Sequence, residues 1–412
     1  MEIKKLKRIF TLSFIISSLL LLQGCKYSKD KASVSISDTT NKTNVTAQIS
    51  PIPIVYTKEE TPKDTEKNNP HKLTLLAVGD NLIHFQVIES GLKINGDYNY
   101  DHLYARLKPD IEAADIAVIN QETILGGDEF PYTGYPIFNS PTQVGDALVK
   151  AGFDVILHAS NHTLDKGYPG VKNTLEYWSK YPHITVLGVN KSQQDQDTIK
   201  IIEKNGIKVA MLNYTYGLNG LPIPDNKPYL VNMLDKPKMK EDIKKAKELA
   251  DFVIVFPHWG TEYEYEPDKK QRELAHFFAN EGVDLVIGTH PHVLEPIEWI
   301  KSDSGHQMLL YYSLGNYVSY QKEAPRMLGG MAHITITKKN EVASISYAGI
   351  TPIVTHYEAN NNYSYEVYKL EDYTIDKAIR HGICKLQKES DFTLAGTRKL
   401  ARLILGKWLT SQ

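Results

Sequence analysis

The sequence predicts an α/β domain built on a sheet that helices cover on both faces. Short, almost wholly apolar runs of strand length, such as Leu73–Val78 and Phe252–Phe256, alternate with segments of helical spacing. Strands that are buried on both faces have this composition. The chain has 412 residues, of which 42% are hydrophobic and 23% charged. This is ordinary globular composition, so the chain is long enough to bury a large core.

The predicted elements follow one another in a regular order. Five apolar strands are expected at 73–78, 116–119, 155–157, 252–256 and 285–287, with helices at 100–113, 142–151, 170–180, 238–249 and 269–281. Two more strands, 185–187 and 208–214, carry no obvious ligand. Residues 331–337 and 341–354 alternate apolar and polar side chains, as half-solvated antiparallel strands do. The tail predicts two helices, at 374–388 and 393–409.

The N-terminus has the features of an export signal. Basic residues precede the apolar run Ile9–Leu22, and Leu21–Cys25 resembles the lipobox of bacterial lipoproteins. We therefore expect residues 1–25 to be a lipoprotein signal peptide, with Cys25 lipidated and the protein held on the outer face of the bacterial cell membrane. A plain secretory signal or an uncleaved anchor is the alternative. Residues 26–70 are polar and lack an apolar period, which predicts a disordered tether.

Charge and cysteine content exclude two classes of protein. The net charge is −2, so the chain has no overall basic field of the kind that nucleic-acid-binding proteins use. Cys25 and Cys384 are the two cysteines, which is too few for a disulfide framework. We therefore expect neither a nucleic-acid partner nor a disulfide-stabilised fold.

Ligand-type side chains follow the ends of five predicted strands. Side chains just past the carboxyl ends of strands in an α/β sheet converge on one crevice. Carboxylate, amide oxygen and imidazole together suit Mn²⁺, Fe²⁺ or Zn²⁺. The set exceeds what one tetrahedral ion needs, so one or two divalent ions are expected, and a carboxylate would bridge a pair. The candidate residues are Asp80, Glu122, Asn161, His162, His258, His290 and His292.

The strand ends also carry an ordered series of motifs. They are Gly79-Asp80, Asn120-Gln121-Glu122, Ser160-Asn161-His162, His258-Trp259-Gly260-Thr261-Glu262, Gly288-Thr289-His290-Pro291-His292 and Ser313-Leu314-Gly315-Asn316-Tyr317. Over residues 73–320 this series resembles the CapA family of capsule-synthesis proteins, which is similar to the calcineurin-like metallophosphoesterases. The resemblance implies a four-layer αββα sandwich. We place it at residues 71–355, followed by a C-terminal helical extension at 356–412.

The resemblance also implies a role for each motif residue. Asp80 matches a metal ligand, and Glu122 matches the carboxylate that bridges two metals. Asn161 matches an amide ligand, and His162 matches the histidine that protonates a leaving oxygen. His258 matches a lone histidine ligand. His290 and His292 match a closing pair, one for each metal.

The chain departs from the phosphoesterase pattern in its first two motifs. Leu82 stands where a histidine is expected, and Glu122 stands where an aspartate is expected. One metal position therefore lacks a ligand unless His84 or Glu262 replaces it. Glu262 is alternatively a carboxylate that orients His258. We expect Asp165 to be a turn or supporting carboxylate.

Two hypotheses of function remain open, together with a third outside capsule synthesis. The resemblance implies capsule or poly-γ-glutamate synthesis or export, either by a metal-dependent hydrolase or by a non-enzymatic factor that assembles or tethers membrane synthase subunits. The substrate would be an anionic polymer or a phosphate ester. A general cell-envelope metallophosphoesterase is the third hypothesis. Taken singly, Asp80 could cap a helix beginning near Asn81, and the His290–His292 pair could form a solvated turn.

Overall fold

The computed structural model describes residues 70–359, 362–386 and 392–410. The predicted signal peptide, lipidated Cys25 and predicted tether up to residue 69 lie outside this part of the chain. The described residues belong to one compact unit, residues 63–412. None of the helices described within it is long and apolar enough to cross a membrane.

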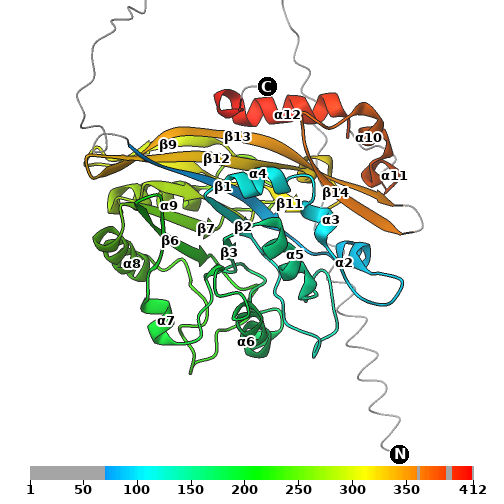
Figure 1. The fold of residues 1–412 in the computed structure, drawn as a ribbon, viewed down its shortest axis with the longest axis horizontal. Helices are drawn as coiled ribbons and strands as arrows, with labels where there is room; N and C mark the ends of the chain where they lie inside the picture. Colours follow the sequence, from blue (N-terminus) through cyan, green and yellow to red (C-terminus); the bar gives the residue numbers. More distant parts are fainter. Residues whose placement is uncertain (1–69, 360–361, 387–391, 411–412) are drawn as a thin grey trace, which may run out of the picture. The chain divides into compact units, whose positions relative to one another are not determined.

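Two sheets form the centre of the unit (Figure 1). The larger has the order β14-β13-β12-β1-β2-β3-β4, and β11 also pairs with β1. Its strands are β1 (His71–Asn81), β2 (Ile116–Asn120), β3 (Val155–Leu157), β4 (Thr185–Leu187), β11 (Asn316–Val318), β12 (Leu328–Lys339), β13 (Val342–Ala359) and β14 (Tyr363–Lys369). The smaller sheet has the order β5-β6-β7-β8-β10-β9. Its strands are β5 (Lys200–Lys204), β6 (Ile207–Thr215), β7 (Phe252–His258), β8 (Leu285–Ile287), β9 (Ile297–Lys301) and β10 (Gln307–Tyr311).

The side chains of β7 point alternately to two cores, which shows how the layers pack. Phe252, Ile254 and Phe256 join the core shared with the larger sheet. Val253 and Val255 point the other way and join a second core with α8 and α9. Because successive side chains of a strand point to opposite faces, both faces of the smaller sheet are buried. The predicted four-layer α/β sandwich is confirmed, although the strand pattern alone led us to expect one covered sheet instead of two.

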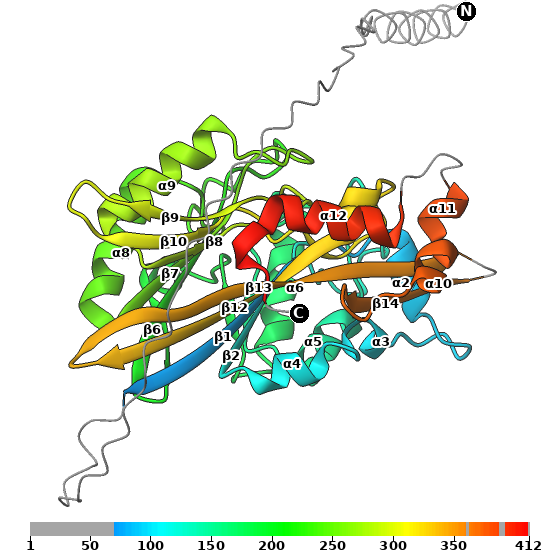
Figure 2. The same ribbon diagram turned by 90° about the horizontal axis from the view of Figure 1, so that it is seen from above.

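The helices surround the sheets, with α8 and α9 beside the smaller sheet, α3, α4 and α5 beside the larger one, and α12 running along β13 (Figure 2). They are α2 (Phe85–Gly91), α3 (Asp101–Tyr104), α4 (Lys108–Ala113), α5 (Gln143–Ala151), α6 (Gly167–Trp178), α7 (Gln193–Asp197), α8 (Lys236–Leu249), α9 (Lys269–Glu281), α10 (Ile375–Arg380), α11 (Gly382–Leu386) and α12 (Leu394–Leu405), with 3-10 turns at Ala324–Met327 and Gly406–Trp408. The helix predicted at 100–113 is two short helices. Pro109 explains the break, since proline lacks the N–H that a continuous helix would need there.

The C-terminal segment continues the larger sheet before it becomes helical. The expected boundary after residue 355 falls inside β13, and β14 then pairs antiparallel with β13. The helix predicted at 374–388 is divided into α10 and α11. Side chains of this segment, including Tyr373, Ile383 and Leu405, are buried in the main core. The segment is therefore an integral layer of the fold.

Candidate metal centre

Both sheets deliver candidate ligands to one place. β1, β2 and β3 run parallel in the larger sheet, and β6, β7 and β8 run parallel in the smaller one. Asp80 lies near the end of β1, and Glu122, Asn161 and His162 follow β2 and β3. His258 is the last residue of β7, and His290 and His292 follow β8. All seven residues are buried.

Two glycines allow the strand ends to approach other backbone closely. A Cβ on Gly79 would lie 1.9 Å from the carbonyl oxygen of Gly315. A Cβ on Gly288 would lie 2.0 Å from the carbonyl oxygen of Tyr312 and 2.3 Å from Nε1 of Trp259. Any side chain at either position would therefore push the Asp80 strand or the histidine loop out of place.

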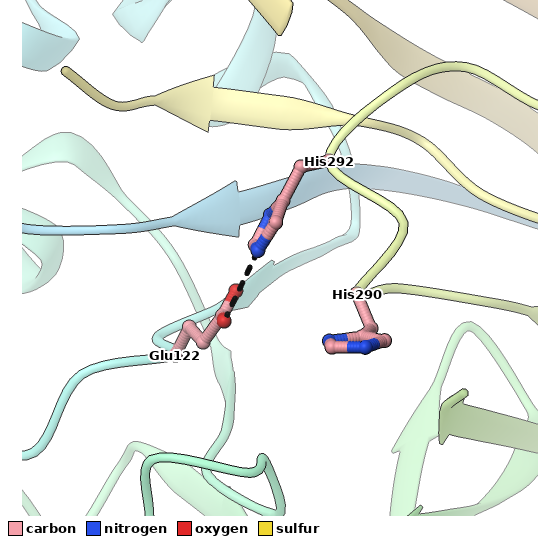
Figure 3. A group of neighbouring side chains, drawn as sticks. All are labelled: Glu122, His290 and His292. Atoms are coloured by element: carbon pink, nitrogen blue, oxygen red, sulfur yellow. Dashed lines mark ion pairs between the residues drawn. The ribbon is translucent and has the colours of Figure 1, made fainter. Parts of the chain in front are cut away.

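The loop after β8 holds its two histidines in unusual backbone conformations. The φ angle is 100° at His290 and 59° at His292. Positive φ is rare for residues with a Cβ, and such strain costs about 1–3 kcal/mol at each residue. The loop turns both imidazoles toward the centre, as Figure 3 shows beside Glu122. The solvated-turn alternative does not hold, because each histidine is only 2% exposed.

The candidate ligand atoms fall into two groups that share Glu122. One contains Glu122, His290 and His292, and the other contains Asp80, Glu122 and His258. Within each group the ligand atoms lie within 4.8 Å of one another. The resemblance assigned His290 and His292 to different metals, whereas the structure places both in one group. Glu122 is the one residue that both groups contain.

Unsatisfied buried atoms show that this donor set fits a cation. Neither carboxylate oxygen of Glu122 has a hydrogen-bond partner, and neither does Nδ1 of His290. A buried polar atom without a partner costs about 1–3 kcal/mol. A divalent ion would satisfy all three atoms at once. The residues present therefore fit one or two divalent ions, which is consistent with the expected cofactor.

The protonation of the centre follows from burial and charge. Burial lowers the pKa values of His258 and His290 well below the ordinary value, so both imidazoles are neutral and can act as ligands. Burial raises the pKa of Glu122 well above its ordinary value, although His292 opposes this shift. Burial also acts against protonation of His292, but Glu122 and Asp80 outweigh it and raise that pKa to about 9. A cation bound here would displace the protons that these groups hold.

The Asp80 side chain is fixed by Asn120 on β2 and by the loop that follows β8. Nδ2 of Asn120, on β2, donates to Oδ1 of Asp80 over 2.8 Å. Oδ2 of Asp80 lies 3.0 Å from Nδ1 of His292, which also lies 3.1 Å from Oδ1 of Asn316 on β11. The next helix begins at Phe85 and has His84 at its N-cap position. The helix-capping alternative for Asp80 is therefore wrong.

His162 is held by a carboxylate, as its expected role requires. Nδ1 of His162 lies 2.8 Å from Oδ2 of Asp165, and that oxygen also accepts from the backbone N–H of Phe138. The Phe138 ring meets the imidazole edge-on at 4.6 Å. The carboxylate thus engages Nδ1 and leaves Nε2 outside this contact. Asp165 thus supports His162 and does not belong to either ligand group.

His258 has different partners from those expected. Its Nε2 lies 2.9 Å from Oδ1 of Asn161, and its Nδ1 lies 3.0 Å from Oγ1 of Thr289. Glu262 was expected either to orient His258 or to replace the missing ligand. Thr289 takes the orienting position instead. Glu262 is half-buried and belongs to neither group of ligand atoms.

The ligand that is missing from the first motif at Leu82 is not replaced by His84. Leu82 is buried, and its backbone N–H donates to the carbonyl oxygen of Val318. His84 accepts at Nδ1 from the backbone N–H of Tyr320 over 3.2 Å, and burial lowers its pKa to about 3. His84 belongs to neither ligand group among the described residues. The structure therefore does not place His84 as a substitute ligand.

Several residues around the centre escaped the sequence analysis. The half-exposed Tyr216 ring lies 4.7 Å from His290, and Asn219 contacts both Asn161 and His162. Both follow the end of β6, which corresponds to the strand predicted at 208–214 to carry no obvious ligand. Applying the strand-end rule to this strand as well would have found them. Tyr263 lies 6.0 Å from His292 and beneath the guanidinium of Arg326, at 3.4 Å. No local pattern marks Arg326, because the fold alone brings it there.

The fold and the centre define a two-sheet α/β protein with metal-competent residues gathered at the ends of its parallel strands. Comparison with known proteins gives the family. Residues 74–321 match the model of the bacterial capsule synthesis protein family PGA_cap, so the chain belongs to that family. The resemblance found in residues 73–320 is thereby confirmed.

Two curated relatives agree with this assignment. The chain is 30% identical over 280 residues to the PGA biosynthesis protein CapA of Bacillus subtilis, covering 65% of this chain and 70% of that protein. It is 30% identical over 256 residues to the capsule biosynthesis protein CapA of Bacillus anthracis, covering 60% of each. Similar structures include the NAD nucleotidase NadN of Haemophilus influenzae (14% identity, TM-score 0.44, 81% of this chain and 67% of that one). Another is the calcineurin-like phosphoesterase YfkN of B. subtilis (16% identity, TM-score 0.39, 80% of this chain and all of that one).

Proposed function

We propose that the chain is a metal-dependent, phosphoesterase-like hydrolase of capsule or poly-γ-glutamate synthesis or export. In this proposal Cys25 carries the lipid that anchors it to the outer face of the bacterial cell membrane. The observation that carries the hydrolase is Glu122, whose two buried carboxylate oxygens have no hydrogen-bond partner and belong to both ligand groups. A buried carboxylate whose nearest cation, His292, is 3.6 Å away and makes no hydrogen bond to it favours a bound metal ion.

Each residue of the centre has a proposed role. Asp80, Glu122, Asn161, His258, His290 and His292 would hold one or two ions of Mn, Fe or Zn. A bound ion supplies an activated water near neutral pH and neutralises charge on a phosphoryl oxygen. His162 donates a proton from Nε2 to the leaving oxygen, and Asp165 holds its ring in the orientation that this requires.

The rim of the centre supports an anionic substrate. Arg326 is the cation stacked on Tyr263, and its backbone carbonyl accepts from Asn316, which also contacts His292. Its Nε is buried and has no hydrogen-bond partner. Tyr216 offers an aromatic face beside His290. A phosphate ester or a carboxylate polymer would find both a cation and a ring surface here.

Metal content and hydrolysis test the proposal together. Residues 63–412, purified without chelator, are expected to contain Mn, Fe or Zn by mass spectrometry and to hydrolyse bis-p-nitrophenyl phosphate when Mn²⁺ is added. The variant His162→Asn should lose about 10²–10⁴-fold in turnover and keep its metal. His290→Ala should lose both. The exposed His183→Asn is the matched control and should change neither. Protein that binds no metal and hydrolyses nothing would overturn the hydrolase.

One observation favours a second candidate function. Leu82 is buried at the position where the phosphoesterase pattern has a histidine, and His84 does not replace it. A centre short of one ligand suits an assembly or tethering factor that keeps a structural ion and binds membrane synthase subunits. Activity that disappears in His162→Asn while metal is retained would exclude this candidate.

The lipid anchor needs its own experiment. Full-length protein produced in a bacterial host with radiolabelled palmitate should carry the label and sediment with membranes. Cys25→Ser should lose the label, whereas Cys384→Ser should keep it. If neither the wild type nor Cys384→Ser carries the label, the proposed anchor is overturned and the proposed hydrolase is unaffected.

A further inference from the structure

The C-terminal helices form a second surface, separate from the metal centre. α10 and most of α12 line a groove of about 730 Å³. Figure 2 shows α12 running along β13, with α10 near one end of it. The groove residues that matter below are Ile375, Ile379, Arg398, Lys399, Arg402 and Leu403.

Three aliphatic side chains at the groove are not part of the core. Ile375 is 67% exposed, Ile379 is 70% exposed and Leu403 is 71% exposed. The packing of α12 against the core is made by other residues of the helix, such as Ala401 and Leu405. Exposed aliphatic side chains gathered in one place mark an interaction surface.

Three cations line the groove. Among the described residues, none of Arg398, Lys399 and Arg402 forms an ion pair. Their neighbours on α10 differ, since Arg380 pairs with Asp376 at 2.9 Å and Lys377 pairs with Glu366 at 3.4 Å. Residues 394–410 contain four cations and no carboxylate. The surface therefore combines protruding aliphatic side chains with uncompensated positive charge.

We infer that this surface binds an anionic lipid membrane. Helices that lie on membranes combine aliphatic side chains, which enter the interface, with Lys and Arg, which meet anionic headgroups. The surface has both components, and its charge is complementary to such a membrane. The predicted anchor at Cys25 would also bring the domain to one. The inference goes beyond the proposed hydrolase, since none of the six residues belongs to the metal centre.

The size of the effect follows from the charge. Each Lys or Arg close to an anionic surface strengthens binding about fivefold. Replacing three cations should therefore weaken binding about a hundredfold. Added salt should weaken binding as well, because the Debye length shortens to about 3 Å at 1 M.

Vesicle flotation tests the inference. Residues 63–412 form the compact unit that holds the described core, so they are used without the N-terminal segment. They should float with vesicles of phosphatidylcholine and phosphatidylglycerol and not with phosphatidylcholine alone. The triple variant Arg398→Gln, Lys399→Gln and Arg402→Gln should lose this binding. So should Ile379→Ser with Leu403→Ser, both exposed positions at which the fold tolerates a polar side chain.

A matched variant controls for net charge. Lys240→Gln, Lys244→Gln and Lys270→Gln remove the same charge from exposed positions on α8 and α9, and should leave flotation unchanged. Equal losses in the two triple variants would overturn the inference, as would equal binding to both vesicle types. A dimer that Leu403→Ser disrupts, without vesicle binding, would instead show a contact between copies and also overturn it. Hydrolysis of a soluble phosphodiester should be unchanged in all of these variants, so the result is independent of the proposed function.

Discussion

Replacing Glu122 by Gln should have opposite effects on stability with and without metal. Both oxygens of Glu122 are buried without a hydrogen-bond partner, and burial raises its pKa well above the ordinary value. In metal-free protein the carboxyl group is therefore a cost to the fold. A neutral amide of the same size reduces this cost, and we expect Glu122→Gln to raise the free energy of unfolding by about 1–3 kcal/mol.

The difference in stability between Glu122→Gln and the wild type changes sign when metal is present. Ligand binding to the folded state adds RT ln(1 + [L]/Kd), which is about 2.7 kcal/mol at a hundredfold excess over Kd. Wild-type protein should gain roughly this much from Mn²⁺. Glu122→Gln should gain little, because Glu122 belongs to both ligand groups. The wild type should then be the more stable protein in Mn²⁺ and the less stable one in EDTA.

Urea unfolding of residues 63–412, followed by tryptophan fluorescence in EDTA and in Mn²⁺, measures both effects. Glu295 supplies the control, since it is also a buried glutamate with one unpartnered oxygen and lies outside both ligand groups. Glu295→Gln should stabilise the protein equally in the two conditions. A Glu122→Gln variant less stable than wild type in EDTA would refute the reasoning, and so would an equal gain from Mn²⁺ in both proteins.

Three further predictions concern the centre and its surroundings. Asp165→Asn should lower turnover about 10–100-fold with metal content unchanged, because His162 loses the carboxylate that orients it; steady-state kinetics with metal analysis will show this. Gly288→Ala should cost about 1–3 kcal/mol in urea unfolding and reduce metal content, since its Cβ would meet the carbonyl oxygen of Tyr312 at 2.0 Å. Burial raises the pKa of Glu295 from 4.5 to about 8, so the folded state holds a proton that the unfolded state releases. The contribution of Glu295 to the free energy of unfolding is complete below about pH 4.5 and is lost as the pH rises to about 8. The free energy of unfolding should therefore be lower at pH 9 than at pH 5 in the wild type, and this difference should be smaller in Glu295→Gln.

Local patterns predicted those parts of the fold that local physics decides. The helix predicted at 269–281 has those bounds in the structure, because Asp268 and Gln271 form a capping box and Gly282 takes a left-handed conformation at its end. The alternation in β12 and β13 likewise predicted antiparallel strands. The division of the strands between two sheets escaped the pattern analysis, since an apolar strand reads the same whichever neighbour it pairs with. Only the family resemblance supplied that division.

The candidate site shows the same limit. The strand-end rule brought out seven residues from both sheets, and the structure gathers Asp80, Glu122, His258, His290 and His292 into two overlapping groups. It assigned no role to Thr289, although that residue lies in one of the strand-end motifs, and it could not find Arg326, which follows no predicted strand end. Both act through contacts that exist only after the two sheets have packed, at 3.0 Å from His258 for Thr289 and at 3.4 Å from the Tyr263 ring for Arg326.

The two departures from the phosphoesterase pattern are connected by geometry. Leu82 offers no ligand atom in the first motif, so the remaining ligand residues must hold any bound ion without one from this position. Glu122 is one methylene longer than the aspartate expected there, and its oxygens lie within reach of both His292, at 3.6 Å, and His258, at 3.9 Å. An aspartate at this position would be shorter, so its carboxylate would be less able to belong to both groups of ligand atoms. The centre therefore relies more heavily on this one carboxylate than the family pattern implied. Replacing Glu122 should remove a ligand from both groups, whereas replacing His290 removes one from a single group.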